Sequence, residues 1–323
     1  MNESTLRPMS ISQVLDRTFH LYRSNFVLFV GVSSILPLFT LIMQFGLAAM
    51  GFSLQNPALN KDPQKFAAVF FVWMFCFLLV YVIGYAIASG ATVHAVSKTH
   101  LGQLVTIGES YKKVFSRIGT ILLIVFAIFA MSVAAIIAGE VAVGIILALV
   151  IPGISHAGGG AGSIALGIIA GIIGLVLLAA GVVGGSYIYL RFSLSIPASI
   201  VEGLSTGRAL KRGSYVAGGA VMRLFLIYLL ATVLAFGLSM VFTMPALLIS
   251  SLVIKKSLML GQGIQYVAGF IGGCLAGPIA PIAVALIYFD QRVRKEAFDL
   301  QLMMQSIEQQ TPPPPGPAMS TIG

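Results

Sequence analysis

The sequence predicts an all-α polytopic membrane protein with six transmembrane helices, built as three repeats of an amphipathic interfacial helix followed by a transmembrane hairpin. Composition is the first observation: of 323 residues, 58% are hydrophobic and only 9% are charged. Soluble domains carry about 25% charged residues, so too few charges remain here to cover a water-facing surface. The other observations are six long apolar stretches and a polar segment that recurs along the chain.

Each of the six apolar stretches is long enough to cross a bilayer, which takes about 20 residues. They cover residues 26–52, 66–96, 118–152, 163–190, 224–253 and 264–289. None alternates like a barrel strand, so each is predicted to be a helix, which satisfies its own backbone groups in lipid. The third stretch is too long for one span and Glu140 interrupts it. We therefore expect residues 141–152 to form a short outer-face or re-entrant helix, followed by a glycine-rich loop at 158–162.

The positive charges predict the orientation of the chain. Fifteen of the 19 Lys and Arg residues lie in the N-terminal segment, the second and fourth connections and the C-terminal segment. Positively charged connections stay in the cytoplasm, so both termini are predicted to be cytoplasmic, in the cell (inner) membrane. The net charge of +9 is thus a topology signal, and no nucleic-acid partner is expected.

Three polar segments resemble one another, at residues 10–19, 106–115 and 205–214. Each precedes a pair of apolar stretches, which predicts repeat units at about 10–96, 106–190 and 205–290. We expect them to form a single integral membrane domain over residues 1–303. Residues 304–323 contain a run of prolines and are predicted to be a disordered tail.

Capping residues predict where the first two polar segments become helical. Ser10 is followed by Gln13, and Thr106 by Glu109, and each pair can satisfy two backbone N–H groups at a helix start. The third segment has Ser205, but an Arg stands at the third position after it, so its capping box is broken.

Two interpretations of these amphipathic segments stay open. They lie in the headgroup plane against their hairpins, or they dock a cytoplasmic partner. In the first case their basic side chains, and those after the sixth span, attract anionic lipids. The candidate interfacial or headgroup contacts are Arg17, Lys112, Lys113, Arg117, Lys211, Arg212, Arg292, Arg294 and Lys295.

Small residues predict how the spans pack. Small residues recur at four-residue spacing in the second span, as Gly84 and Ala88, and glycines do so in the fourth and sixth spans, where they let helix backbones approach closely. We expect these three spans to meet at the centre. At the exit of the sixth span, Asp290 with Arg294 and Arg292 with Glu296 are spaced for ion pairs along one helix.

Reactive side chains are scarce. Glu140 is the candidate intramembrane polar residue, because a charge in the bilayer is costly and often functional. However, it follows about 20 apolar residues, and this depth predicts that Glu140 lies instead at a hydrated helix end near the outer surface. No histidine or cysteine pair has metal-ligand spacing, and the common catalytic motifs are absent. Neither a metal nor another cofactor is expected, and the chain is not expected to be an enzyme. That expectation would change if Glu140, Glu202 and a histidine shared one cavity.

Three motifs carry a resemblance to a known family. They are Arg7-Pro-Met-Ser-Ile with Asp16-Arg-Thr-Phe and Tyr22-Arg-Ser-Asn-Phe, then Leu190-Arg-Phe with Ala209-Leu-Lys-Arg, and finally the run from Tyr288 to Leu300. Together they resemble prokaryotic six-span proteins related to the membrane domain of glycerophosphoryl diester phosphodiesterases. The resemblance implies the six-span fold and places catalysis, where relatives have it, in a separate soluble domain. Gly213 departs from the family pattern, which implies a looser third amphipathic helix.

The sequence therefore favours a non-catalytic membrane protein, a scaffold or accessory subunit in envelope or lipid homeostasis. Its expected partners are the bilayer, including anionic lipids, and a membrane-protein partner or a second copy of the chain. The alternative is a transporter or channel component for a small or amphipathic solute, which internal repeats favour.

Overall fold

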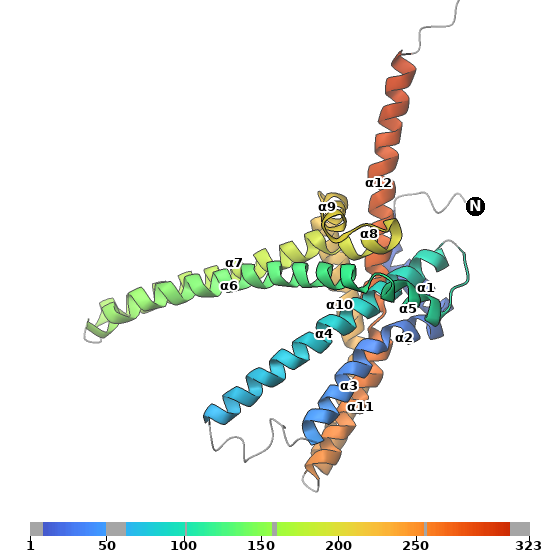
Figure 1. Ribbon diagram of the computed structural model, residues 1–323. Coiled ribbons are helices and arrows are strands. Elements are labelled where there is room, and N and C mark those ends of the chain that lie inside the picture. The colour runs from blue at the N-terminus through green and yellow to red at the C-terminus, as the bar shows by residue number, and fades with distance from the viewer. Residues whose placement is uncertain (1–8, 50–62, 101, 157–159, 255–256, 311–323) are drawn as a thin grey trace, which may run out of the picture.

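The computed structural model describes residues 9–49, 63–100, 102–156, 160–254 and 257–310, and the described part of the chain is entirely helical apart from short connections (Figure 1). The helices are α1 (Ile11–Ser24), α2 (Phe26–Ser33), α3 (Ile35–Ala49), α4 (Pro63–His100), α5 (Ile107–Phe115), α6 (Ile118–His156), α7 (Ala161–Phe192), α8 (Ser195–Glu202), α9 (Thr206–Ala217), α10 (Val221–Val253), α11 (Leu258–Ala276) and α12 (Ile279–Gln310). The predicted all-α class is confirmed.

Five helical segments are long and apolar enough to cross a membrane. They are Ala67–His100, Ile118–Gly153, Ala161–Glu202, Val221–Val253 and Leu258–Glu296. Helices α2 and α3 pass the same test only as a pair, and a bend of 43° separates them. Such lengths of apolar helix make this a multi-pass membrane protein.

Helix α6 corrects the prediction for the third apolar stretch. It runs without a break from Ile118 to His156, so residues 141–152 do not form a separate helix and Glu140 does not mark a helix end. Glu has a good helix propensity, and neighbouring Gly139 packs against Gly181 of α7. Both features keep this turn helical. The exposed Glu140 side chain has no ion-pair partner among the described residues.

The glycines pack differently from the prediction. A Cβ added at Gly181 of α7 would lie 3.1 Å from the Gly139 Cα of α6, and one at Gly185 would lie 2.7 Å from the Ser132 carbonyl oxygen. These close approaches join the two helices of one hairpin. Gly84 of α4 contacts α3, and Gly273 of α11 contacts Pro37 of α3. Glycine therefore brings hairpin partners together, and also α11 and α3, rather than gathering the second, fourth and sixth spans.

The long helices diverge as arms from one hub (Figure 1). Helices α6 and α7 form one arm, α4 another, and α3 with α11 a third, while α12 leaves on the opposite side. Helix α12 continues to Gln310, so residues 304–310 of the predicted disordered tail are helical. Residues 311–323 lie outside the described residues.

The three predicted amphipathic helices α1, α5 and α9 all lie at this hub. Helix α5 packs on α4, α9 packs on α7 and α8, and α1 packs on α12. The capping boxes at the starts of α1 and α5 are confirmed. At the start of α9, Arg208 donates instead to the Ser205 hydroxyl, over 3.2 Å, so the third box is broken as predicted.

Candidate functional site: two ionic clusters around helix α12

The polar residues in the middle of α12 lie on two of its faces. Tyr288, Arg292 and Glu296 follow one another at four-residue intervals, and so do Asp290 and Arg294. Side chains four residues apart share a face of an α-helix. One face of α12 meets α8 and α9, and the other meets α1 and α10.

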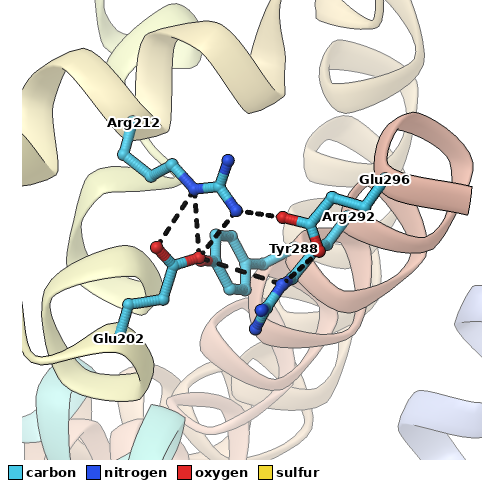
Figure 2. A network of polar contacts seen from close by, with 5 residues as sticks. All are labelled: Glu202, Arg212, Tyr288, Arg292 and Glu296. Carbon is cyan, nitrogen blue, oxygen red and sulfur yellow. Dashed lines mark hydrogen bonds and ion pairs between the residues drawn. The ribbon is translucent and has the colours of Figure 1, made fainter. Parts of the chain in front are cut away.

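The first face forms the Glu202 cluster, shown in Figure 2, which contains Glu202, Arg212, Tyr288, Arg292 and Glu296. The Arg212 Nε donates to both carboxylate oxygens of Glu202, at 3.0 and 3.1 Å. Its Nη2 donates to Glu296, and the Tyr288 hydroxyl donates to Glu202. The Arg292 Nε donates to Glu296 at 2.6 Å and lies 3.9 Å from Glu202. The cluster thus joins α8, α9 and α12.

Local backbone geometry positions Glu202 and Arg212. Glu202 is the last residue of α8, and Gly203 follows it with a positive φ of 70°. Glycine adopts that conformation without a steric penalty, so the chain reverses at once into α9. Gly213 then allows α9 to lie against the start of α8, because an added Cβ would come within 2.6 Å of the Ser195 nitrogen. Gly213 therefore gives a tight contact, not the looser helix that the resemblance implies.

The second face forms the Asp290 cluster, which contains Met9, Arg223, Asp290 and Arg294. The Asp290 carboxylate is fully buried and pairs with Arg223 at 2.8 Å and Arg294 at 3.0 Å. The Met9 backbone N–H donates to Asp290 at 2.7 Å, and both arginines donate to the Met9 carbonyl. A buried carboxylate requires such partners. This cluster fastens the chain just before α1 to α10 and α12.

Pairing leaves neither cluster with a free acid or base. The Glu202 cluster holds two carboxylates and two guanidinium groups, so its charges balance. Burial alone would lower the pKa of Arg212, but hydrogen bonds to Glu296 and Glu202 outweigh it and raise that pKa above its usual value. The arrangement is suited to holding helices together, and it presents no activated nucleophile.

The predicted headgroup contacts fall into two groups. Arg212, Arg292 and Arg294 belong to the clusters, and Lys295 donates to the Tyr215 carbonyl with its Nζ 4.7 Å from the ring centroid. All four side chains therefore have partners within the protein. The pairs of Arg292 and Arg294 along α12 were predicted, whereas the contacts that Arg212 and Lys295 make with other helices were not. Arg17, Lys112, Lys113, Arg117 and Lys211 are half-buried or exposed, and their headgroup role stays a prediction.

Some of the site was visible in the sequence. The predicted pairs Asp290 with Arg294 and Arg292 with Glu296 are confirmed. Arg223 and Tyr288 were not predicted as members, because their partners Asp290 and Glu202 are more than 60 residues away along the chain. Glu202 and Arg212 are ten residues apart but lie on different helices, so no spacing along one helix predicted their pairing. Their only local signal is a polar side chain beside an apolar stretch.

No group of three or more His, Cys, Asp or Glu residues within the described ranges could hold a metal ion. Comparisons of the chain with known protein families, with curated proteins and with solved structures found no match.

Proposed function

We propose that this protein is a non-catalytic membrane scaffold or accessory subunit in envelope or lipid homeostasis, built from three repeats around a hub on the cytoplasmic face. One observation carries the proposal. The acidic side chains of the Glu202 and Asp290 clusters are all paired with arginine, and the pairs hold helices together. Both clusters therefore have a structural role, and in this proposal the exposed surfaces of the protein make its functional contacts.

Burial at equivalent positions supports the repeat. The residue four positions after each helix cap is fully buried: Val14 in α1, Ser110 in α5 and Ala209 in α9. The residue eight positions after the cap is Thr18, Val114 or Gly213, and all three are buried. Three segments thus bury the same two positions. Helices α5 and α9 also pack on a span of the preceding unit, and α1 of the first unit packs on α12 of the last unit.

In this proposal α2 and α3 together form the first of six spans, and the Lys and Arg distribution places the hub in the cytoplasm. The diverging arms expose many large apolar side chains, such as Phe71, Leu175 and Leu252, which lipid or a membrane partner would cover. Lys112 and Lys211 are exposed on α5 and α9. Basic residues at a membrane surface attract anionic headgroups by about 1 kcal/mol each.

The test is to extract the full-length protein with its surrounding lipid into nanodiscs and to measure the anionic fraction of that lipid. We expect enrichment over the bulk membrane, and a loss of about fivefold in that enrichment for each charge removed in Lys112→Gln and Lys211→Gln. The control is Lys255→Gln with Lys256→Gln. These lysines stand in the connection between the apolar stretches 224–253 and 264–289, which the charge distribution predicts on the other side of the membrane. An unenriched lipid shell, or equal loss in the control, would overturn the headgroup role.

A transporter for a small or amphipathic solute is the second candidate, since two cavities lie between the spans. Solute flux in proteoliposomes would support it over the scaffold. The absence of flux across a broad panel of solutes would support the scaffold.

A further inference from the structure

Two adjoining cavities lie where the arms meet the hub. The first, of about 180 Å³, lies between α4, α6, α7 and α8, and the second, of about 240 Å³, lies between α4, α7, α8, α10 and α12. They share the side chains Tyr85, Tyr189, Ser193 and Ile196. A water molecule occupies about 30 Å³ in the liquid, so each cavity has room for several heavy atoms.

Hydroxyl groups from three different spans meet at the shared wall. The Tyr85 and Tyr189 hydroxyl oxygens are 3.1 Å apart. Tyr228 lines the second cavity, and its ring centroid is 5.8 Å from that of Tyr189. Ser132 also lines the first cavity, and its buried hydroxyl has no hydrogen-bond partner. A buried hydroxyl without a partner is unfavourable, so this wall favours an occupant that can hydrogen-bond.

The rest of the first cavity's wall is apolar, Ser89 and Thr232 add hydroxyl groups to the second, and no charged side chain lines either cavity. An ionic ligand would lose its hydration there without meeting an opposite charge, which is strongly unfavourable. A ligand with a hydroxyl or ester group and an apolar chain would match both the hydroxyls and the apolar surface.

The first cavity is lined by residues of α4 and of α6 and α7. These helices belong to two arms that diverge from the hub (Figure 1). Tyr81 of α4, which lines this cavity, and Phe126 of α6 are exposed, so this part of the surface is apolar. In a bilayer such a surface faces acyl chains. An occupant can therefore enter sideways from the membrane.

We infer that these cavities bind the polar end of an uncharged lipid, such as an acylglycerol, with its acyl chain leaving between α4 and α6. The inference does not depend on the scaffold proposal, because it concerns a ligand site within the spans and not the surface of the hub.

The experiment uses the full-length protein in nanodiscs and a monoacylglycerol that carries a photoactivatable group on its acyl chain. After illumination, mass spectrometry locates the crosslinked peptides. We expect labels in α4 around residue 82 and in α6 around residues 125–132. Unlabelled monoacylglycerol should displace the probe at least tenfold more effectively than its phosphorylated, charged counterpart. Labels elsewhere, or equal displacement by the charged lipid, would overturn the inference.

Two variants test the site directly. Tyr189→Phe removes a shared hydroxyl but keeps the ring, and should weaken probe binding about fivefold, as expected for one lost hydrogen bond. Val82→Phe fills the first cavity and should abolish labelling. The matched controls are Tyr266→Phe on α11 and Ile83→Phe, because the exposed Ile83 side chain lines neither cavity. Unchanged labelling in both test variants, or equal loss in the controls, would refute the site.

Discussion

Arg212 joins α9 to both α8 and α12, so Arg212→Gln should destabilise the hub. The guanidinium and the Glu202 carboxylate are about four-fifths buried, with exposed fractions of 24% and 18%. A hydrogen bond to a charged partner in such a setting contributes about 1.5–3 kcal/mol. The Glu296 carboxylate is 40% exposed, so that contact adds only about 0.2–1 kcal/mol.

Glu202 is not left without partners in the variant, because Tyr288 and Arg292 remain beside it. We therefore expect the free energy of unfolding to fall by about 2–3 kcal/mol, from the lower part of these ranges. For a domain of this size that corresponds to a melting temperature lower by roughly 4–10 °C. The measurement is the loss of the monodisperse size-exclusion peak after heating in one detergent.

Arg208→Gln is the matched control, since Arg208 is exposed on the same helix and donates to the Ser205 hydroxyl. It should shift the melting temperature by no more than about 1–2 °C, as for surface substitutions. A double-mutant cycle with Glu202→Gln should show a coupling of about 1–2 kcal/mol. Equal shifts in melting temperature for Arg212→Gln and Arg208→Gln, or additive effects in the double-mutant cycle, would refute the role of Arg212 in joining α8, α9 and α12.

Three further changes test individual helix contacts. Gly213→Ala should lower the melting temperature by at least 5 °C in the same assay, because its Cβ would collide with the α8 backbone. Gly181→Leu should separate α6 from α7 at Gly139, at a cost of about 1–3 kcal/mol, and should speed proteolysis of the hairpin. Backbone and side-chain hydrogen bonds with Thr106 lower the pKa of Glu109. The cap therefore stabilises α5 fully at pH values above the usual Glu pKa of about 4.3, and this stabilisation is lost as the pH falls through the lower pKa of Glu109 in the folded protein. The measurement is amide exchange in the first turn of α5, which should become faster as the cap weakens.

Each of these predictions has a matched control. Added Cβ atoms at Gly207 of α9 and Gly171 of α7 would meet open space. Gly207→Ala and Gly171→Leu should therefore leave the melting temperature within about 2 °C, and effects as large as those of their partners would contradict the packing. Glu109→Gln removes the titrating group, so acid-dependent exchange that persists in this variant would contradict the role of the cap.

Local features of this protein were predictable from its sequence. The apolar stretches predicted the long helices because satisfying the backbone in lipid depends only on a continuous apolar segment. The caps of α1 and α5 and the ion pairs along α12 were predictable because their partners stand three or four residues apart. Such contacts form within one helix, whatever surrounds it.

Tertiary structure decided everything that depends on a partner from another helix. Glycine spacing shows that a close approach is possible, but only the fold shows that Gly181 meets Gly139 rather than another span. Likewise, the burial of Asp290 and its pairing with Arg223 arise because α1, α10 and α12 converge. Every apolar helix satisfies its own backbone hydrogen bonds equally well, so its apolar sequence does not determine which helix packs beside it. Shape and charge at the contacts make that choice, and they arise only when distant segments meet.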